Sequence, residues 1–130
     1  LKRGPGGTVD VEFLVQMLQL KHAHESVAVL VPNTIGAIEE LRKQGALDAD
    51  DALVLRESYE FLRSVESRLR LLNTTARHDL PEEPRDLDGL AYLLNCTSST
   101  ELIQSCQRVT RRVRDLFERR FAAELHTAGG

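Results

Sequence analysis

The sequence predicts an all-α fold, an antiparallel helical bundle of about five helices, for three reasons. Apolar residues recur at spacings of three, four and seven in two long segments, which is the period of an amphipathic helix. Capping residues and Pro or Gly breakers separate the helical segments. No segment has the alternating pattern of a strand. The chain has 130 residues, 42% of them hydrophobic, which suits one globular domain.

The first helix is expected from about Thr8 to His24, with Thr8 as its N-cap and acids in its first turns. Two apolar strips lie on nearly opposite sides of this helix. They are formed by Val11, Leu14, Val15 and Leu18, and by Phe13, Met17 and Leu20. A surface helix of a self-contained bundle needs one strip. Either this helix is covered on both sides within the bundle, or its second strip docks onto another domain.

The second helix is expected from Asn33 to Gln44, with Asn33 or Thr34 as its cap and Gly45 as its stop. The third and longest helix is expected from Asp48, its cap, to Ala76. Its apolar face is formed by Ala52, Leu55, Tyr59, Leu62, Leu69 and Leu72.

Glu66 lies on the apolar face of the third helix. A buried carboxylate needs a partner, and Arg63, Arg70 or a residue of another helix could supply one. We interpret Glu66, Arg63 and Arg70 as a structural ion pair that fixes helix register, in preference to a catalytic group.

A loop containing Pro81 and Pro84 precedes a short helix, expected from Asp86 to Asn95. Ser98 and Glu101 have the spacing of a capping box for the last helix, which is expected to run to about Leu125. Its apolar face is formed by Leu102, Cys106, Val109, Val113 and Leu116. The expected organisation is therefore a hinge at residues 1–7, a helical bundle at 8–125 and a disordered tail at 126–130.

Composition excludes several classes of function. A net charge of −3 argues against a nucleic-acid binder, and the longest apolar runs are too short to span a membrane. The two cysteines, Cys96 and Cys106, are typical of a reduced cytoplasmic protein, and no zinc-ligand spacing is present. Three arginines line one flank of the last helix, either as a solvated, salt-bridged face or as a contact for an acidic partner. They are Arg108, Arg112 and Arg119.

The opening loop, KRGPGG, brings basic side chains and backbone N–H groups to a helix start, which suits an anion, although a plain connector is the commoner meaning of such glycines. It is not a Walker A loop, because no Gly-Lys-Ser/Thr follows. Asp10 and Glu12 lie about 200° apart around the helix, so together they cannot chelate one metal. No Ser/His/Asp set is found. We therefore identify no catalytic or metal-binding residue and no self-sufficient active site.

Four segments, taken in order, resemble the helical domain that follows the nucleotidyltransferase domain in glutamine synthetase adenylyltransferases. They are KRGPGGTVDVEFLVQMLQL, PNTIGAIEELRKQGAL, SYEFLRSVESRLRLL and DLPEEPRDLDGLAYLL, and the resemblance extends from Lys2 to about Phe121. The family has two such domains, and Val9-Asp10 after the glycines is similar to the adenylylating half. The chain also begins at Leu1 and not at Met, which we interpret as a piece of a larger protein.

The resemblance implies a parent enzyme that transfers AMP from ATP, with Mg, to a tyrosine of glutamine synthetase and removes it by phosphorolysis, under control of the PII signal protein. It implies that the metal-binding carboxylates belong to the preceding domain, so this chain alone is expected to be inactive. The alternatives are the helical domain of a PII uridylyltransferase and a free-standing helical interaction module.

Within this scheme, two groups of residues are expected to meet the preceding domain. Those expected to face the cleft or lie near phosphate are Lys2, Arg3, Gly6, Gly7, Asp10 and Glu12. Those expected to dock onto the nucleotidyltransferase domain are Phe13, Met17 and Leu20.

Overall fold

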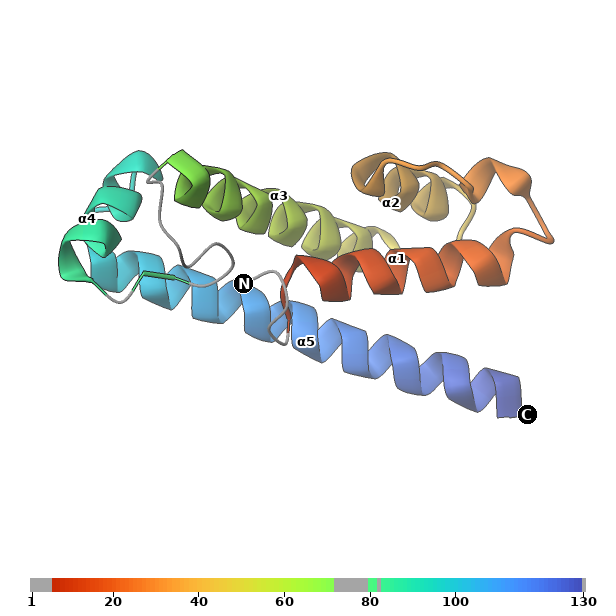
Figure 1. The fold of residues 1–130 in the computed structure, drawn as a ribbon. Coiled ribbons are helices and arrows are strands. Elements are labelled where there is room, and N and C mark those ends of the chain that lie inside the picture. The colour runs from red at the N-terminus through yellow and green to blue at the C-terminus, as the bar shows by residue number, and fades with distance from the viewer. Residues whose placement is uncertain (1–5, 72–79, 82, 130) are drawn as a thin grey trace.

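The computed structural model describes residues 6–71, 80–81 and 83–129, and these residues form helices and no strand. The elements are α1 (Thr8–His22), the 3₁₀ helix η1 (Val27–Val29), α2 (Thr34–Lys43), α3 (Ala49–Leu71), α4 (Pro84–Leu93) and α5 (Ser99–Gly129). Figure 1 shows them as one elongated bundle. The predicted all-α helical bundle is confirmed.

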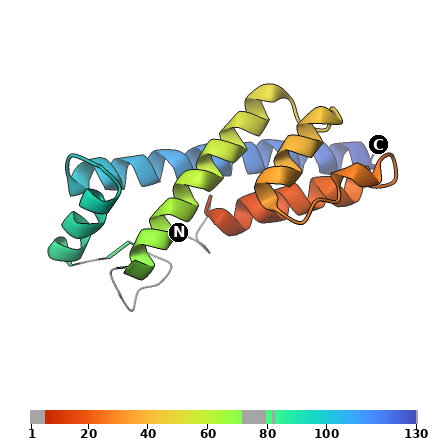
Figure 2. The same ribbon diagram turned by 90° about the horizontal axis from the view of Figure 1, so that it is seen from above.

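The two long helices, α3 and α5, run in opposite directions along the molecule (Figures 1 and 2). α1 also runs opposite to α3, so α1 and α5 are parallel although three other α-helices separate them in sequence. α2 packs on α1 and α3 in one half of the molecule, and α4 packs on α3 and α5 in the other half. The start of α1 therefore lies near the middle of the bundle.

The hydrophobic core has two parts. The larger core joins α1, α2, η1, the first half of α3 and the later part of α5, and the smaller core joins the second half of α3, α4 and the first part of α5. The larger core consists of Val11, Leu14, Val15, Leu18, Val29, Ala37, Ile38, Leu41, Leu47, Ala52, Leu55, Val113 and Leu116. The smaller core consists of Val65, Leu69, Leu90, Ala91, Leu102 and Cys106.

Three predicted helix starts are confirmed by their hydrogen bonds. Asn33 Oδ1 accepts the Gly36 N–H at 2.9 Å, and Asp48 Oδ1 accepts the Asp51 N–H at 2.7 Å. At the start of α5, Ser98 Oγ accepts the Glu101 N–H at 3.1 Å. These side chains satisfy backbone donors that a helix leaves without partners in its first turn.

The start of α1 differs from the prediction. Gly7 is the N-cap, and no side chain caps the helix. Thr8 cannot serve as the cap because it is already the first helical residue and its hydroxyl donates a hydrogen bond to Glu66 in α3. The prediction from local sequence was wrong here because the Thr8 hydroxyl is hydrogen-bonded to Glu66, a residue distant in sequence.

Helix ends also differ from the predicted ones. α1 ends at His22, and η1, which was not predicted, follows it. The side-chain amide of Gln19 in α1 holds this segment against α1. It donates hydrogen bonds to the carbonyl oxygens of Val29 and Val31, at 2.7 and 2.8 Å.

α4 and α5 each extend beyond their predicted range at one end. The predicted third helix is only partly within the described residues. α4 begins at Pro84, because a proline fits the first turn of a helix. α5 continues past Leu125 to Gly129, since no proline or glycine interrupts it earlier. The predicted part of the third helix at 72–76 lies outside the described residues.

Candidate functional site

The chain enters the bundle at Gly6, in a position that only glycine fits. Its φ is +78°, and a Cβ placed there would lie 1.9 Å from the carbonyl oxygen of Thr110 in α5. The Gly6 N–H donates to Asp10 Oδ2 at 2.7 Å. The backbone before α1 is thus held between α1 and α5.

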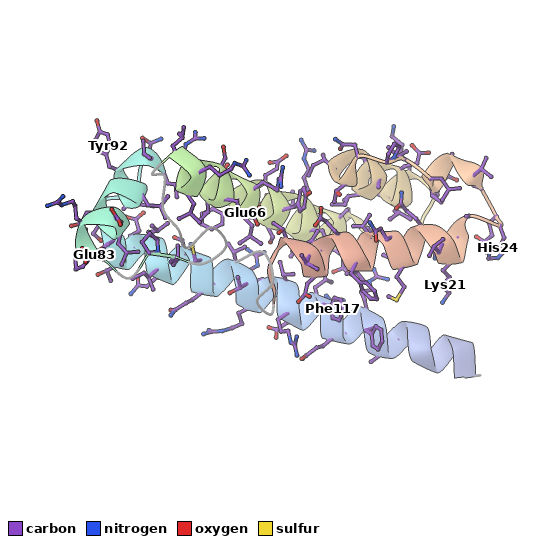
Figure 3. All side chains as sticks on the ribbon, in the orientation of Figure 1. Lys21, His24, Glu66, Glu83, Tyr92 and Phe117 are labelled. Carbon is purple, nitrogen blue, oxygen red and sulfur yellow. The ribbon has the colours of Figure 1, made fainter. Side chains whose placement is uncertain are left out.

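The next contact along the chain is a buried hydrogen bond between Thr8 and α3. Thr8 and Glu66 are 1% and 4% exposed, and the Thr8 hydroxyl donates to Glu66 Oε1 at 2.8 Å. Arg63 Nη1 lies 3.6 Å from Glu66 Oε2. The second partner of this buried carboxylate is therefore the Thr8 hydroxyl and not Arg70. Figure 3 shows Glu66 on α3, close to the start of α1. We call Gly6, Thr8, Asp10, Glu66 and Thr110 the anchor.

Asp10 and Glu12 have separate partners. Asp10 accepts the Gly6 N–H, whereas Glu12 Oε2 accepts the hydroxyl of Tyr59 in α3 at 3.2 Å. Burial raises the pKa of the Tyr59 hydroxyl, and the charge of Glu12 raises it further. Within the part of the chain that the structure describes, no group of three or more His, Cys, Asp or Glu could hold a metal ion. Lys2 and Arg3 lie outside the described residues.

One apolar strip of α1 faces the core and the other does not. The first strip is between 0 and 1% exposed. In the second strip Phe13 is 51% and Leu20 76% exposed, whereas Met17 is half-buried against the larger core. Complete coverage of α1 within this bundle, which was one of the two alternatives, is therefore wrong.

Two half-buried aromatic rings of α5 adjoin the exposed strip, and one of them, Phe117, also packs against the larger core. The ring centroids of Phe13 and Phe117 are 6.1 Å apart, and those of Phe117 and Phe121 are 5.8 Å apart with the rings nearly parallel. Figure 3 shows Phe117 between α1 and α5. We call this surface, formed by Val9, Phe13, Leu20, Phe117 and Phe121, the α1–α5 seam. The sequence indicated its α1 half through the second strip, but the parallel pairing that adds the α5 half is a tertiary feature.

A buried ion-pair cluster was not found by sequence reasoning. Asp51, in the first turn of α3, is 5% exposed and is held by Arg119 Nη2 at 3.0 Å and Arg120 Nη2 at 2.7 Å. Burial raises the pKa of the Asp51 carboxyl, but the hydrogen bonds and charges of the two arginines outweigh it, so the net pKa is lowered. Arg119 remains 62% exposed and salt-bridged, as the solvated alternative predicted, but its partner is Asp51 of α3. A sequence signal existed, because Asp51 shares the buried side of α3 with Leu55.

The two cysteines are free thiols, and Cys106 is buried in the smaller core. Burial raises the pKa of the Cys106 thiol to about 11, so it stays protonated at neutral pH and acts as a small apolar side chain. Across the described residues, no helix is both long enough and apolar enough to cross a membrane.

Comparison with known proteins places the chain in a family. The GlnD PII-uridylyltransferase family model matches residues 1–121. Similar curated proteins are bifunctional glutamine synthetase adenylyltransferase/adenylyl-removing enzymes. The one from Streptomyces coelicolor is 39% identical over 96% of this chain and 13% of its own length.

Two further relatives have the same description. The protein from Mycobacterium tuberculosis (strain H37Rv) is 42% identical over 72% of this chain and 9% of its own length. The protein from Xanthomonas campestris pv. campestris is 32% identical over 97% of this chain and 13% of its own length. The chain thus spans between 9 and 13% of the length of these relatives, and the resemblance to glutamine synthetase adenylyltransferases is confirmed. It belongs to the GlnD PII-uridylyltransferase family, and the curated proteins to which it is similar are described as bifunctional glutamine synthetase adenylyltransferase/adenylyl-removing enzymes.

Proposed function

We propose that this chain is the helical domain that follows the adenylylating nucleotidyltransferase domain in a bifunctional glutamine synthetase adenylyltransferase. The parent enzyme would use ATP and Mg to transfer AMP to a tyrosine of glutamine synthetase, and would remove it by phosphorolysis. PII would regulate it, and the result would be control of nitrogen assimilation. The names of the similar proteins support the parent activity.

The role of this chain in that reaction would be positioning. Adenylyl transfer depends mainly on the orientation of the reactants and on metal-bound phosphates. The described carboxylates near the start of α1 are engaged in structural hydrogen bonds, so we assign the Mg ligands to the preceding domain. The chain alone would then be inactive.

The α1–α5 seam carries the proposal that α1 docks onto the preceding domain. The seam starts at Val9, between Thr8 and Asp10 of the anchor, and Phe13 leaves half of its side chain exposed. An exposed apolar strip of this kind is typical of a docking surface.

The contacts of Gly6 support a hinge that is shorter than residues 1–7 and ends before Gly6. Gly6 and Gly7 are buried, and Gly6 is held by both Asp10 and α5, so rotation between the domains would occur before Gly6. Lys2 and Arg3 would stay available to approach phosphate in the cleft, whereas Asp10 and Glu12 would brace the anchor and α3.

Activity of the full-length protein tests this function. We expect the full-length protein to transfer AMP from ATP to glutamine synthetase, and Phe13→Asp to reduce that transfer at least about tenfold, because a charge in a desolvated contact is costly. Val27→Asp, at an exposed site in η1, is the matched control and should leave the rate unchanged.

A different result would favour the alternative within the family. Transfer of UMP from UTP to PII, with no AMP transfer to glutamine synthetase, would identify the parent as a PII uridylyltransferase, the activity in the name of the matching family model.

A further inference from the structure

Helix α1 has two apolar sides, and each of them has the composition of a strip that faces a core. One strip consists of Val11, Leu14, Val15 and Leu18, and the other of Phe13, Met17 and Leu20, with Val9 on the same side. In the structure the first strip is at most 1% exposed, whereas Phe13 and Leu20 remain 51% and 76% exposed. Apolar burial alone does not explain this choice, because both strips consist of large apolar side chains.

A buried hydrogen bond between α1 and α3 distinguishes the two sides. Thr8 precedes Val11 by three residues and Val15 by seven, so it lies on their side of α1. Its hydroxyl donates to Glu66 Oε1 at 2.8 Å, and the two residues are only 1% and 4% exposed. Figure 3 shows Glu66 on α3, close to the start of α1. When the first strip is buried, the Glu66 carboxylate therefore has a hydrogen-bond donor on α1.

The opposite orientation of α1 would bring a second carboxylate to the same place. Asp10 lies about 200° from Thr8 around the helix, because it is two residues further along the chain. A rotation of α1 that buried Phe13 would move the Thr8 hydroxyl away from Glu66 and turn Asp10 toward it. Two carboxylates close together in a buried site repel each other. The rotated orientation would thus lose a donor to Glu66 and gain a repulsion.

We propose that Glu66 selects which apolar strip of α1 enters the core. It stabilises the observed orientation through the Thr8 hydroxyl and disfavours the rotated orientation by repelling Asp10. Buried polar groups have a comparable role in coiled coils, where they fix register and the number of helices. Arg63 Nη1, 3.6 Å from Glu66 Oε2, can pair with Glu66 in either orientation because both residues belong to α3. The strip left outside forms the α1 half of the seam, so the importance of this selection for docking rests on the proposed function.

Replacement of Glu66 by leucine tests the selection in the 130-residue chain. Glu66→Leu keeps a side chain of similar size but removes both the acceptor for Thr8 and the charge that repels Asp10. We expect amide NMR spectra to show a second set of α1 signals with at least about 5% of the intensity, where the unchanged chain shows one set. Hydroxyl-radical labelling of Leu18, which is 0% exposed in the observed orientation, should rise at least about twofold.

A second variant leaves no unpaired hydroxyl at this contact. Thr8→Val/Glu66→Leu replaces both buried polar side chains by apolar ones of similar size and should also show the second set of signals. Asp51→Asn is the control for a loss of stability alone, because Asp51 is held by arginines of α5, and it should keep one set. One set of α1 signals and unchanged labelling of Leu18 in the folded double variant would overturn the proposal. AMP transfer in the full-length protein tests the proposed function separately, so either can fail without the other.

Discussion

At the scale of single residues, the anchor depends on the absence of a side chain at Gly6. Two glycines of the described chain with positive φ allow this to be tested, because Gly6 has a φ of +78° and Gly45 a φ of +82°. They differ in space: a Cβ on Gly6 would meet Thr110, whereas one on Gly45 would meet nothing within 4 Å. Backbone strain is therefore common to both positions, and the steric clash is not.

We predict that Gly6→Ala lowers the free energy of unfolding by at least about 2 kcal/mol, and Gly45→Ala by about 1 kcal/mol. Urea unfolding of both variants measures the difference. Equal losses at the two positions would mean that the contact between Gly6 and α5 is not formed in solution.

Asp51 makes stability depend on pH. Its folded-state pKa is below the ordinary value of 3.8, so its contribution is fully present above that value and is lost as the pH falls through the folded-state pKa. We predict that Asp51→Asn costs about 2–3 kcal/mol at pH 7, because charged hydrogen bonds to Arg119 and Arg120 are removed. The difference from the unchanged chain should shrink as the pH falls below 3.8.

Urea unfolding at pH 7 and at pH 3 measures this effect, and Asp50→Asn, at an exposed position in the same turn, is the control. A stability difference for Asp51→Asn that is the same at both pH values would show that the carboxylate is not held by the arginines.

At the scale of elements, helix existence followed from local sequence, whereas details that depend on distant partners did not. Asn33, Asp48 and Ser98 cap as predicted because their hydrogen bonds close within three residues. Thr8 was misassigned because its partner, Glu66, is 58 positions away. The Asp51 cluster was missed for the same reason.

The hydrogen bond from the Glu101 N–H to Ser98 Oγ caps α5, and its contribution to stability can be measured. Ser98→Ala should cost about 1 kcal/mol, because the Glu101 N–H then loses its side-chain acceptor. Thr100→Ala alters an exposed position in the same turn and should change stability by less than about 0.5 kcal/mol. Thermal or urea unfolding compares them, and a larger loss for Thr100→Ala would contradict this capping arrangement.

At the scale of the whole molecule, α3 and α5 join two cores of unequal size. Among the described residues, the smaller core holds fewer apolar side chains, and the helices that α4 contacts are α3 and α5. Regions with few buried contacts open at lower free energy than the rest of a protein. We predict that native-state hydrogen exchange of α4 amides proceeds at lower free energy than exchange of α1 amides. Equal protection of both helices would indicate a single cooperative unit.

Only the α1 half of the proposed docking surface could be predicted from the sequence. Phe13 and Leu20 stand out in the sequence because they form a second apolar strip on a short helix. Phe117 and Phe121 do not, since the pairing of α1 with α5 in parallel decides that these rings join the strip. The Gly6 contact with Thr110 likewise depends on how the helices pack.

We expect the α1–α5 seam to be covered by another domain in the full-length protein. Hydroxyl-radical footprinting of the isolated chain and of the full-length protein tests it directly, because phenylalanine and tyrosine side chains are labelled according to exposure. We predict that Phe13, 51% exposed, is labelled in the isolated chain and protected in the full-length protein, while Tyr92, 81% exposed on α4, is labelled equally in both. Equal labelling of Phe13 in both proteins would show that no other domain covers the seam.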